Sequence, residues 1–252
     1  MGAHRVLVTD IDGTLIGDDA ALDRFADWMA DHRDGYRLAY ATGRLRESLV
    51  QLIANTALPE PDAVISGVGT EIHGPDGQPW PGWRERLDGW DASRVRAALR
   101  PFRWLEPQSD TAQTALKASY DVPGLRATDL SSIRRALTAA RLVATLVYSA
   151  NRHLDVLPAA AGKGIAARFL ADAWAAPPTD VLVFGDSGND LQLFRQGFRG
   201  TLVANALPEL SLAVGKGTYR SHLPYAAGVL DGIRYWSGTD RPAPAKGLNR
   251  SG

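Results

Sequence analysis

Two carboxylates, Asp10 and Asp12, stand one residue apart where the apolar run Val6–Thr9 ends. Like charges at the end of a buried strand repel each other and resist losing water, unless a cation or a reacting group lies between them. Gly13 then allows the backbone to turn away, which leaves both carboxylates at the mouth of a sheet. The segment is therefore predicted to carry chemistry as well as to form a strand.

A second acidic site repeats this design at Asp186 and Asp190, which follow the apolar run Val181–Phe184. The carboxyl ends of parallel strands meet at one edge of a sheet, where α/β proteins bind their ligands. The four aspartates would then offer a shell of hard oxygen ligands, which suits Mg²⁺ with water and a phosphate oxygen completing the coordination. A magnesium site is therefore expected at this edge.

Two further segments place anion-binding groups near the carboxylates. Thr42 and Gly43 follow another apolar run, and Lys163 lies between glycines at the start of an amphipathic stretch. Backbone N–H groups at a helix start attract anions, and a lysine there can meet the same anion. The helix dipole disfavours a cation at this position, so its presence favours a functional role for Lys163.

The elements that would position these residues alternate between β-rich and amphipathic stretches. Such alternation is typical of an α/β fold, here a Rossmann-like doubly wound parallel sheet with helices on both faces. Strands are expected at Arg5–Thr9, Arg37–Thr42, Ala63–Ser66, Asp180–Gly185 and Thr201–Ala204. Helices are expected at Ala20–His32, Arg46–Asn55, Gly164–Trp174, Asp190–Gln196 and Ala227–Trp236.

The middle of the chain has a different character and is expected to be an inserted α+β domain. The Gly/Pro/Trp-rich stretch 74–83 cannot form a regular helix or a central strand, so it is interpreted as a connector. Helices are expected at Ala92–Phe102 and Thr128–Arg141, and strands at Ala115–Val122, Leu142–Ser149 and His153–Leu157. The predicted division is a core of residues 1–78 and 159–252 with an insertion of 79–158. The tail 237–252 is expected to be unstructured.

Composition limits the classes of partner. The chain has 252 residues, 45% of them hydrophobic, and its 28 basic and 28 acidic residues give no net charge. This balance supports a real core and gives no reason to expect nucleic acid or a membrane surface as a partner. The absence of cysteine excludes disulfides and thiolate metal sites. No apolar run approaches the roughly 20 residues that span a bilayer, so a cytoplasmic location is expected.

These motifs together resemble the haloacid dehalogenase superfamily of phosphatases. The likeness rests on Asp-x-Asp-Gly-Thr at 10–14, the threonine at the second strand end, the lysine, and Gly-Asp-x-x-x-Asp at 185–190. The insertion resembles the C2-type cap of that superfamily. Segments 38–44, 67–72, 117–120, 155–158 and 185–190 further resemble the sucrose-6-phosphate phosphatase family, and the likeness runs from Val6 to Trp236.

The resemblance implies a role for each matched residue. Asp10 would attack phosphorus and form an aspartyl-phosphate, while Asp12 would protonate the leaving sugar oxygen and later activate water. Phosphate binding falls to Thr42, Gly43, Lys163 and Asn189. Mg²⁺ is assigned to Asp10, the backbone carbonyl of Asp12, Asp186 and Asp190, the last as a direct ligand or as the residue that positions Lys163. Sugar binding is assigned to Tyr40, Arg44, Glu71, Lys117 and Ser119.

The implied substrate is a phosphorylated disaccharide, with sucrose 6-phosphate as the first choice. Segments 146–149, 155–164 and 205–210 resemble mannosylfructose-phosphate phosphatases equally well, so that substrate remains an alternative. A phosphosugar mutase and a non-catalytic sugar-phosphate sensor are the other readings. Neither the oligomeric state nor an association with the upstream sugar-phosphate synthase is determined by the sequence.

Overall fold

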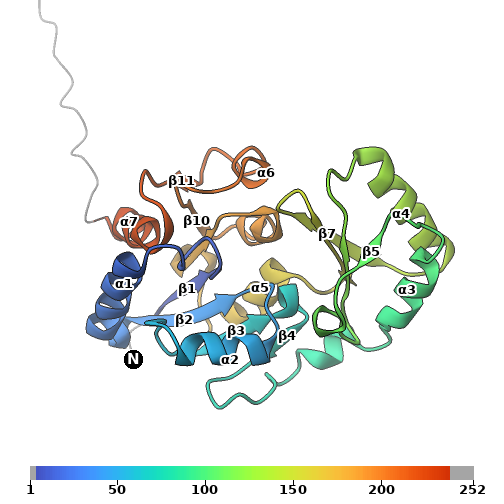
Figure 1. The fold of residues 1–252 in the computed structure, drawn as a ribbon. Helices are drawn as coiled ribbons and strands as arrows, with labels where there is room; N and C mark the ends of the chain where they lie inside the picture. Colours follow the sequence, from blue (N-terminus) through green and yellow to red (C-terminus); the bar gives the residue numbers. More distant parts are fainter. Residues whose placement is uncertain (1–3, 239–252) are drawn as a thin grey trace, which may run out of the picture.

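The computed structural model describes residues 4–238, which form an α/β core and a smaller α+β cap beside it (Figure 1). This arrangement confirms the predicted fold class. The predicted unstructured tail lies almost wholly outside the described residues. No helix within 4–238 is long and apolar enough to cross a membrane.

The core is built on a sheet in the order β11-β10-β9-β1-β2-β3-β4, in which β4 alone runs antiparallel to its neighbour. Its strands are β1 (Arg5–Thr9), β2 (Tyr36–Ala41), β3 (Ala63–Ser66), β4 (Glu71–His73), β9 (Val181–Gly185), β10 (Arg199–Leu202) and β11 (Tyr219–Arg220). Its helices are α1 (Asp19–His32), α2 (Arg46–Ala54), α5 (Lys163–Ala173), α6 (Pro208–Ser211) and α7 (Tyr225–Ser237).

Both faces of this sheet are covered, which explains why its central strands are apolar runs rather than alternating ones. Val6 and Val8 of β1 pack in the hydrophobic cluster that contains the buried residues of α5. Leu7 points to the opposite face, where it joins the cluster formed with α1 and α7.

Strand β1 lies between β2 and β9, so the chain winds outward in both directions from this central strand. Such a reversal of strand order opens a crevice at the carboxyl ends of the strands. The residues that follow β1, β2 and β9 are Asp10, Thr42 and Asp186. The topology therefore brings the three predicted motifs to one edge of the sheet.

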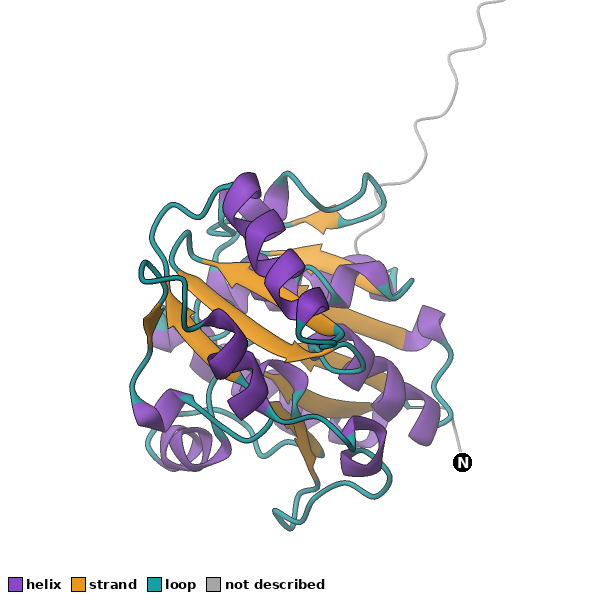
Figure 2. Cartoon of the chain, turned by 90° about the vertical axis from the view of Figure 1, so that its right-hand side faces the viewer, coloured by secondary structure: helices purple, strands orange, loops and turns teal. Residues whose placement is uncertain are grey.

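The cap is a four-stranded antiparallel sheet in the order β5-β6-β8-β7. Its elements are α3 (Ala92–Leu99), β5 (Glu106–Pro107), β6 (Ala118–Asp121), α4 (Ala127–Ala139), β7 (Ala144–Ser149) and β8 (His153–Pro158). Helices α3 and α4 cover one face, and Figure 2 views the molecule from this side. The other face of the sheet is left to meet the core.

Most predicted elements are confirmed to within a few residues, and the differences have local causes. The helix expected at Asp190–Gln196 is instead two short 3-10 turns, Gly188–Asp190 and Leu193–Arg195. Strand β4 was not predicted because three residues between glycine-rich loops give no periodic signal. Trp83 and Leu87 pack in the core cluster rather than in the cap, although the predicted insertion starts at residue 79. That boundary stays a prediction.

Candidate active site

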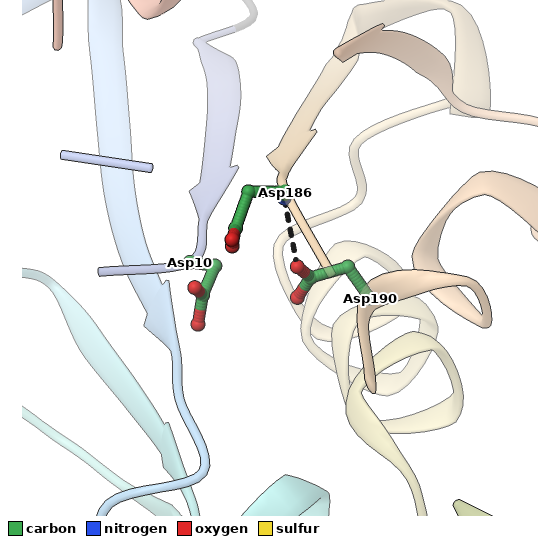
Figure 3. Close-up of side chains that lie close together, drawn as sticks. All are labelled: Asp10, Asp186 and Asp190. Atoms are coloured by element: carbon green, nitrogen blue, oxygen red, sulfur yellow. Dashed lines mark hydrogen bonds between the residues drawn. The ribbon is translucent and has the colours of Figure 1, made fainter. Parts of the chain in front are cut away.

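The centre of the site is a cluster of three buried aspartates, Asp10, Asp186 and Asp190 (Figure 3). One carboxylate oxygen from each lies within 4.8 Å of the others, and the residues are 4%, 8% and 0% exposed. Asp10 follows β1, and the other two belong to the loop after β9. The predicted convergence of two strand ends is therefore observed.

Lys163 is the cation that faces this cluster. Its fully buried ammonium group lies 2.7 Å from carboxylate oxygens of both Asp10 and Asp190, and 2.7 Å from the amide oxygen of Asn189. These three bonds use all three ammonium hydrogens. Lys163 begins α5 directly after Gly162, whose φ of +135° is accessible to glycine but strained for other residues. The side chain is thus held rigidly beside Asp10.

The electrostatics of the cluster favour an additional cation. Burial raises the pKa of Asp10 well above its ordinary value, and Asp190 and Asp186 add to this against the opposing effect of Lys163. Burial, followed by repulsion from Asp190, raises the pKa of Asp186 to about 7. Burial alone would lower the pKa of Lys163, but Asp10 and Asp190 raise it, so the lysine remains charged. One ammonium group cannot neutralise three carboxylates.

The donor set fits a hard cation such as Mg²⁺, with Asp10 and Asp186 as the carboxylates best placed to hold it. Thr14 donates a hydrogen bond of 3.2 Å to Asp186 Oδ1, which orients that side chain. Asp190 has both oxygens engaged: Oδ1 with Lys163, and Oδ2 with the backbone N–H groups of Asp186 and Ser187. Of the two roles predicted for Asp190, this geometry favours positioning Lys163 and the loop.

Thr42 and Gly43 lie beside the cluster at the end of β2. The fully buried Thr42 hydroxyl accepts the backbone N–H of Arg44 at 3.1 Å and can still donate its own hydrogen. A Cβ on Gly43 would lie 3.8 Å from Asn189 Nδ2, an ordinary contact. Thr42 thus follows β2, the strand that pairs with β1, and Lys163 reaches Asp10 from the start of α5.

Asp12 is not part of the aspartate cluster in this structure. Its half-exposed carboxylate pairs with Arg44, whose Nε and Nη2 each lie 2.7 Å from one of its oxygens. Such a two-point pair fixes both side chains. Arg44, which is predicted to bind sugar, is therefore paired with Asp12, the residue that is predicted to transfer the proton.

The cap contributes a polar network that faces the core. Lys117 Nζ lies 2.7 Å from Ser119 Oγ and 3.3 Å from Asp155 Oδ1, and the serine hydroxyl donates to the same aspartate at 2.6 Å. A cavity of about 490 Å³ extends from Gly43 and Asn189 of the core to Lys117 and Asp155 of the cap. This cavity is called the cleft below.

The structure does not bring Tyr40 and Glu71 into the cleft. Tyr40 is fully buried in the hydrophobic cluster around α1, and its hydroxyl donates to the Pro59 carbonyl at 2.7 Å. Glu71 accepts a hydrogen bond from Ser66 and lines a separate cavity of about 380 Å³ beside Trp80 and Trp83. No contact with the cleft supports their predicted sugar-binding roles.

Three residues of the site were not assigned from the sequence. Thr14 belongs to the first motif, and its position directly after Gly13 could have indicated that it lies near the carboxylates. Gly13 has a φ of +82°, and a Cβ there would lie 2.6 Å from Asp186 Oδ2, so glycine is required for close approach as well as for the turn. Asp155 lies in one of the segments that resemble the family, but its pairing with Lys117 depends on the fold of the cap.

Comparisons with known proteins agree with this geometry. The family model for sucrose-6F-phosphate phosphohydrolase matches residues 3–237. The mannosylfructose-phosphate phosphatase of Agrobacterium fabrum is 36% identical over 246 residues, which cover 92% of this chain and 96% of that protein. Sucrose-phosphatase 1 of Nicotiana tabacum is 34% identical over 220 residues, 82% of this chain, and the match spans only 52% of the tobacco protein.

A solved structure gives the same result in three dimensions. The sucrose-phosphatase of Synechocystis sp. PCC6803, in complex with sucrose and phosphate, matches with a TM-score of 0.88 and 32% sequence identity. The match covers 94% of this chain and 99% of that one. The likeness thus includes both the core and the cap. The chain belongs to the sucrose-6F-phosphate phosphohydrolase family, a family of phosphatases within the haloacid dehalogenase superfamily.

Proposed function

We propose that this protein is a Mg²⁺-dependent phosphomonoesterase that hydrolyses sucrose 6-phosphate to sucrose and phosphate. The observation that carries the proposal is the cleft, which offers Gly43 and Asn189 at the core end as groups to bind phosphate, and Lys117 and Asp155 at the cap end as groups to bind sugar hydroxyls. A phosphorylated disaccharide needs both kinds of group at once. The presence of sucrose and phosphate in the related Synechocystis structure supports the same choice.

The first half of the reaction would transfer the phosphoryl group to the protein. A carboxylate oxygen of Asp10 attacks phosphorus, the new P–O bond forms, and the bond from phosphorus to the sugar oxygen breaks. Asp12, in its protonated form, gives its proton to that sugar oxygen. Thr42 donates to one phosphoryl oxygen, and Lys163 exchanges one of its three hydrogen bonds for a bond to another. The buried ammonium stabilises the negative charge there. Asp12 must first leave Arg44, because that pair engages both of its carboxylate oxygens.

The second half would return the protein to its starting state. Asp12, now ionised, removes a proton from water, and the water oxygen attacks phosphorus as the bond to Asp10 breaks. Phosphate leaves, Asp10 is again a carboxylate, and Asp12 is again protonated. Mg²⁺ held by Asp10 and Asp186 would supply positive charge against the phosphoryl oxygens. Asp190 keeps Lys163 aligned with Asp10 throughout.

Mannosylfructose phosphate is the second candidate substrate, because the similarity to the Agrobacterium enzyme extends over nearly the full length of both proteins. The two sugars differ in configuration at one carbon of the non-phosphorylated ring. Discrimination would then depend on whether one hydroxyl finds its partner in the cleft, since an unpaired polar group in a buried site is costly. Lys117, Ser119 and Asp155 are the groups placed to make that distinction.

A substrate panel tests the proposal. Phosphate release would be measured from sucrose 6-phosphate, mannosylfructose 6-phosphate, trehalose 6-phosphate and simple hexose phosphates, with Mg²⁺ and with EDTA. We expect the highest kcat/KM on sucrose 6-phosphate and no release in EDTA. Comparable rates on every substrate would refute the disaccharide proposal, and phosphate exchange without net release would indicate a mutase. Failure to hydrolyse any phosphate ester would favour the non-catalytic sensor.

A further inference from the structure

One carboxylate, Glu209 of α6, bonds to both the cap and the catalytic loop of the core. Its Oε1 accepts a hydrogen bond from the backbone N–H of Ala150 in the cap at 2.7 Å. The same oxygen accepts the backbone N–H of Gly188 in the core at 3.0 Å. Ala150 lies in the turn between β7 and β8, where it and Asn151 have φ values of +52° and +49°. One oxygen therefore bridges the tip of a cap hairpin and the loop that follows β9.

The loop on the core side of this bridge is the one that carries the site. Gly188 lies between Asp186 and Asp190, and next to Asn189, which accepts a hydrogen bond from Lys163. The backbone N–H of Leu207, just before α6, donates to the Asp186 carbonyl at 2.7 Å. A shift of Glu209 relative to the loop would therefore displace the residues that face Asp10.

Gly188 shows independently how closely the cap approaches this loop. A Cβ at this position would collide with the carbonyl oxygen of Tyr148, the residue two before Ala150 on β7. Its backbone φ is not in the left-handed region, so the need for glycine comes from the approach of the cap and not from the turn. The hairpin thus rests directly on the catalytic loop, with Glu209 tying the two together.

We propose that Glu209 is a positioning residue that links closure of the cap to the placement of the 186–190 loop. In this structure, its carboxylate binds both backbone groups at once. When the cap swings away, the bond to Ala150 is lost and the loop keeps only its core-side partner. Closure over a bound sugar and alignment of the catalytic loop are then one event. This proposal rests on the proposed function for its kinetic test, which measures KM for the disaccharide phosphate.

Three substitutions at Glu209 separate the effect of side-chain length from the effect of the negative charge. Glu209→Gln keeps both the length and a carbonyl oxygen that can accept two hydrogen bonds. Glu209→Asp keeps the charge but is one methylene shorter, and Glu209→Ala removes the acceptor. We expect the Ala and Asp variants to raise KM for the disaccharide phosphate about tenfold, the size of one charge-assisted hydrogen bond. The KM of the Gln variant should stay within about threefold of the wild-type KM.

A distance measurement tests the same proposal without any substrate. The chain contains no cysteine, so fluorophores can be placed at Asp27→Cys on α1 and at Val143→Cys in the cap, which is 77% exposed. Glu209→Ala and Glu209→Asp should increase the population with a long dye-to-dye distance, and Glu209→Gln should not. Leu212→Ala, at an 86% exposed position just after α6, is the matched control and should change nothing.

Two results would overturn the proposal. An unchanged distance distribution in Glu209→Ala would show that the bridge does not hold the cap. A wild-type-like Asp variant beside a defective Gln variant would assign the effect to charge alone. Because the distances are measured without substrate, they decide the question even if the substrate panel refutes the proposed function.

Discussion

The excess negative charge around Asp186 should make the protein more stable when this charge is removed. Asp186 is 8% exposed and shares the site with Asp10 and Asp190, against the single ammonium of Lys163. Asp186→Asn removes the charge and keeps an oxygen that can accept the hydrogen bond from Thr14. The variant is therefore expected to stabilise the metal-free protein while removing a magnesium ligand.

The magnitude follows from the pKa of Asp186, which burial raises from 3.8 to about 7. One pKa unit corresponds to about 1.4 kcal/mol, so ionising this group in the folded protein costs at most about 4 kcal/mol relative to the unfolded chain. Between pH 4 and 7 the folded state binds more protons than the unfolded state. Stability from this group is therefore present below pH 4 and is lost as the pH rises through 7.

Urea unfolding in EDTA between pH 4 and 8 measures this effect. Asp186→Asn should be more stable than the wild type by about 2 to 4 kcal/mol at pH 8, and the difference should fall toward zero near pH 4. Mg²⁺ should stabilise the wild type at pH 8 and leave the variant unchanged. Asp88→Asn, at an exposed position, is the control and should be neutral. A variant that is neutral or destabilised at pH 8 would show that the buried charge is already compensated.

Three other substitutions test separate parts of the site. Asp10→Asn should lower turnover by on the order of 10⁴-fold with an unchanged circular dichroism spectrum; near-normal activity would exclude Asp10 as the nucleophile. Lys163→Met breaks the buried pairs with Asp10 and Asp190, and should cost about 3 to 5 kcal/mol in urea unfolding at pH 8; unchanged stability would contradict the proposed pairing. Lys117→Ala should raise KM for the disaccharide phosphate about tenfold with a smaller effect on kcat. If the variant has the wild-type KM on every substrate, Lys117 is not part of the sugar site.

The strand-end residues could be predicted from the sequence because the physical constraints on them are local. An apolar run such as Arg5–Thr9 must be a buried strand, and its length fixes where Asp10 emerges. The alternation of strands and helices then requires parallel neighbours, whose carboxyl ends meet at one edge. Asp10 and Asp186 therefore meet at this edge as expected, beside the end of β2 that carries Thr42, and Lys163 at the start of α5 bonds to Asp10 there.

Residues whose role depends on side-chain direction could not be assigned in the same way. Tyr40 lies two residues before Thr42, yet strand alternation sends it to the face shared by Leu38, whereas Ala39 and Ala41 face the other cluster. Its hydroxyl then satisfies the Pro59 carbonyl, as a buried tyrosine requires. Sequence similarity places a tyrosine near the site, and only the fold shows which way it points.

The cap end of the cleft depends on strand pairing within the cap. Ser119 of β6 lies directly opposite Asp155 of β8, so the two side chains meet on one face of the sheet. Lys117, two residues before Ser119, shares that face and reaches the same aspartate. A shift of one residue in this register would put Lys117 and Ser119 on the face opposite Asp155, and no local pattern in the sequence fixes the register.

The two ends of the cleft therefore rest on different kinds of structural constraint. In the proposed mechanism, phosphoryl transfer would rely on strand ends of a sheet buried on both faces, where Asp10 cannot move without disturbing the core. Sugar recognition would rely on a small sheet whose hairpin turn at Ala150 bonds to Glu209, which also bonds to Gly188 in the loop that follows β9. Because that contact also involves Glu209 and Gly188, a sugar that holds the cap closed would also hold the catalytic loop in place. Substrate choice in the cap can thereby affect catalysis in the core without any change to the aspartates.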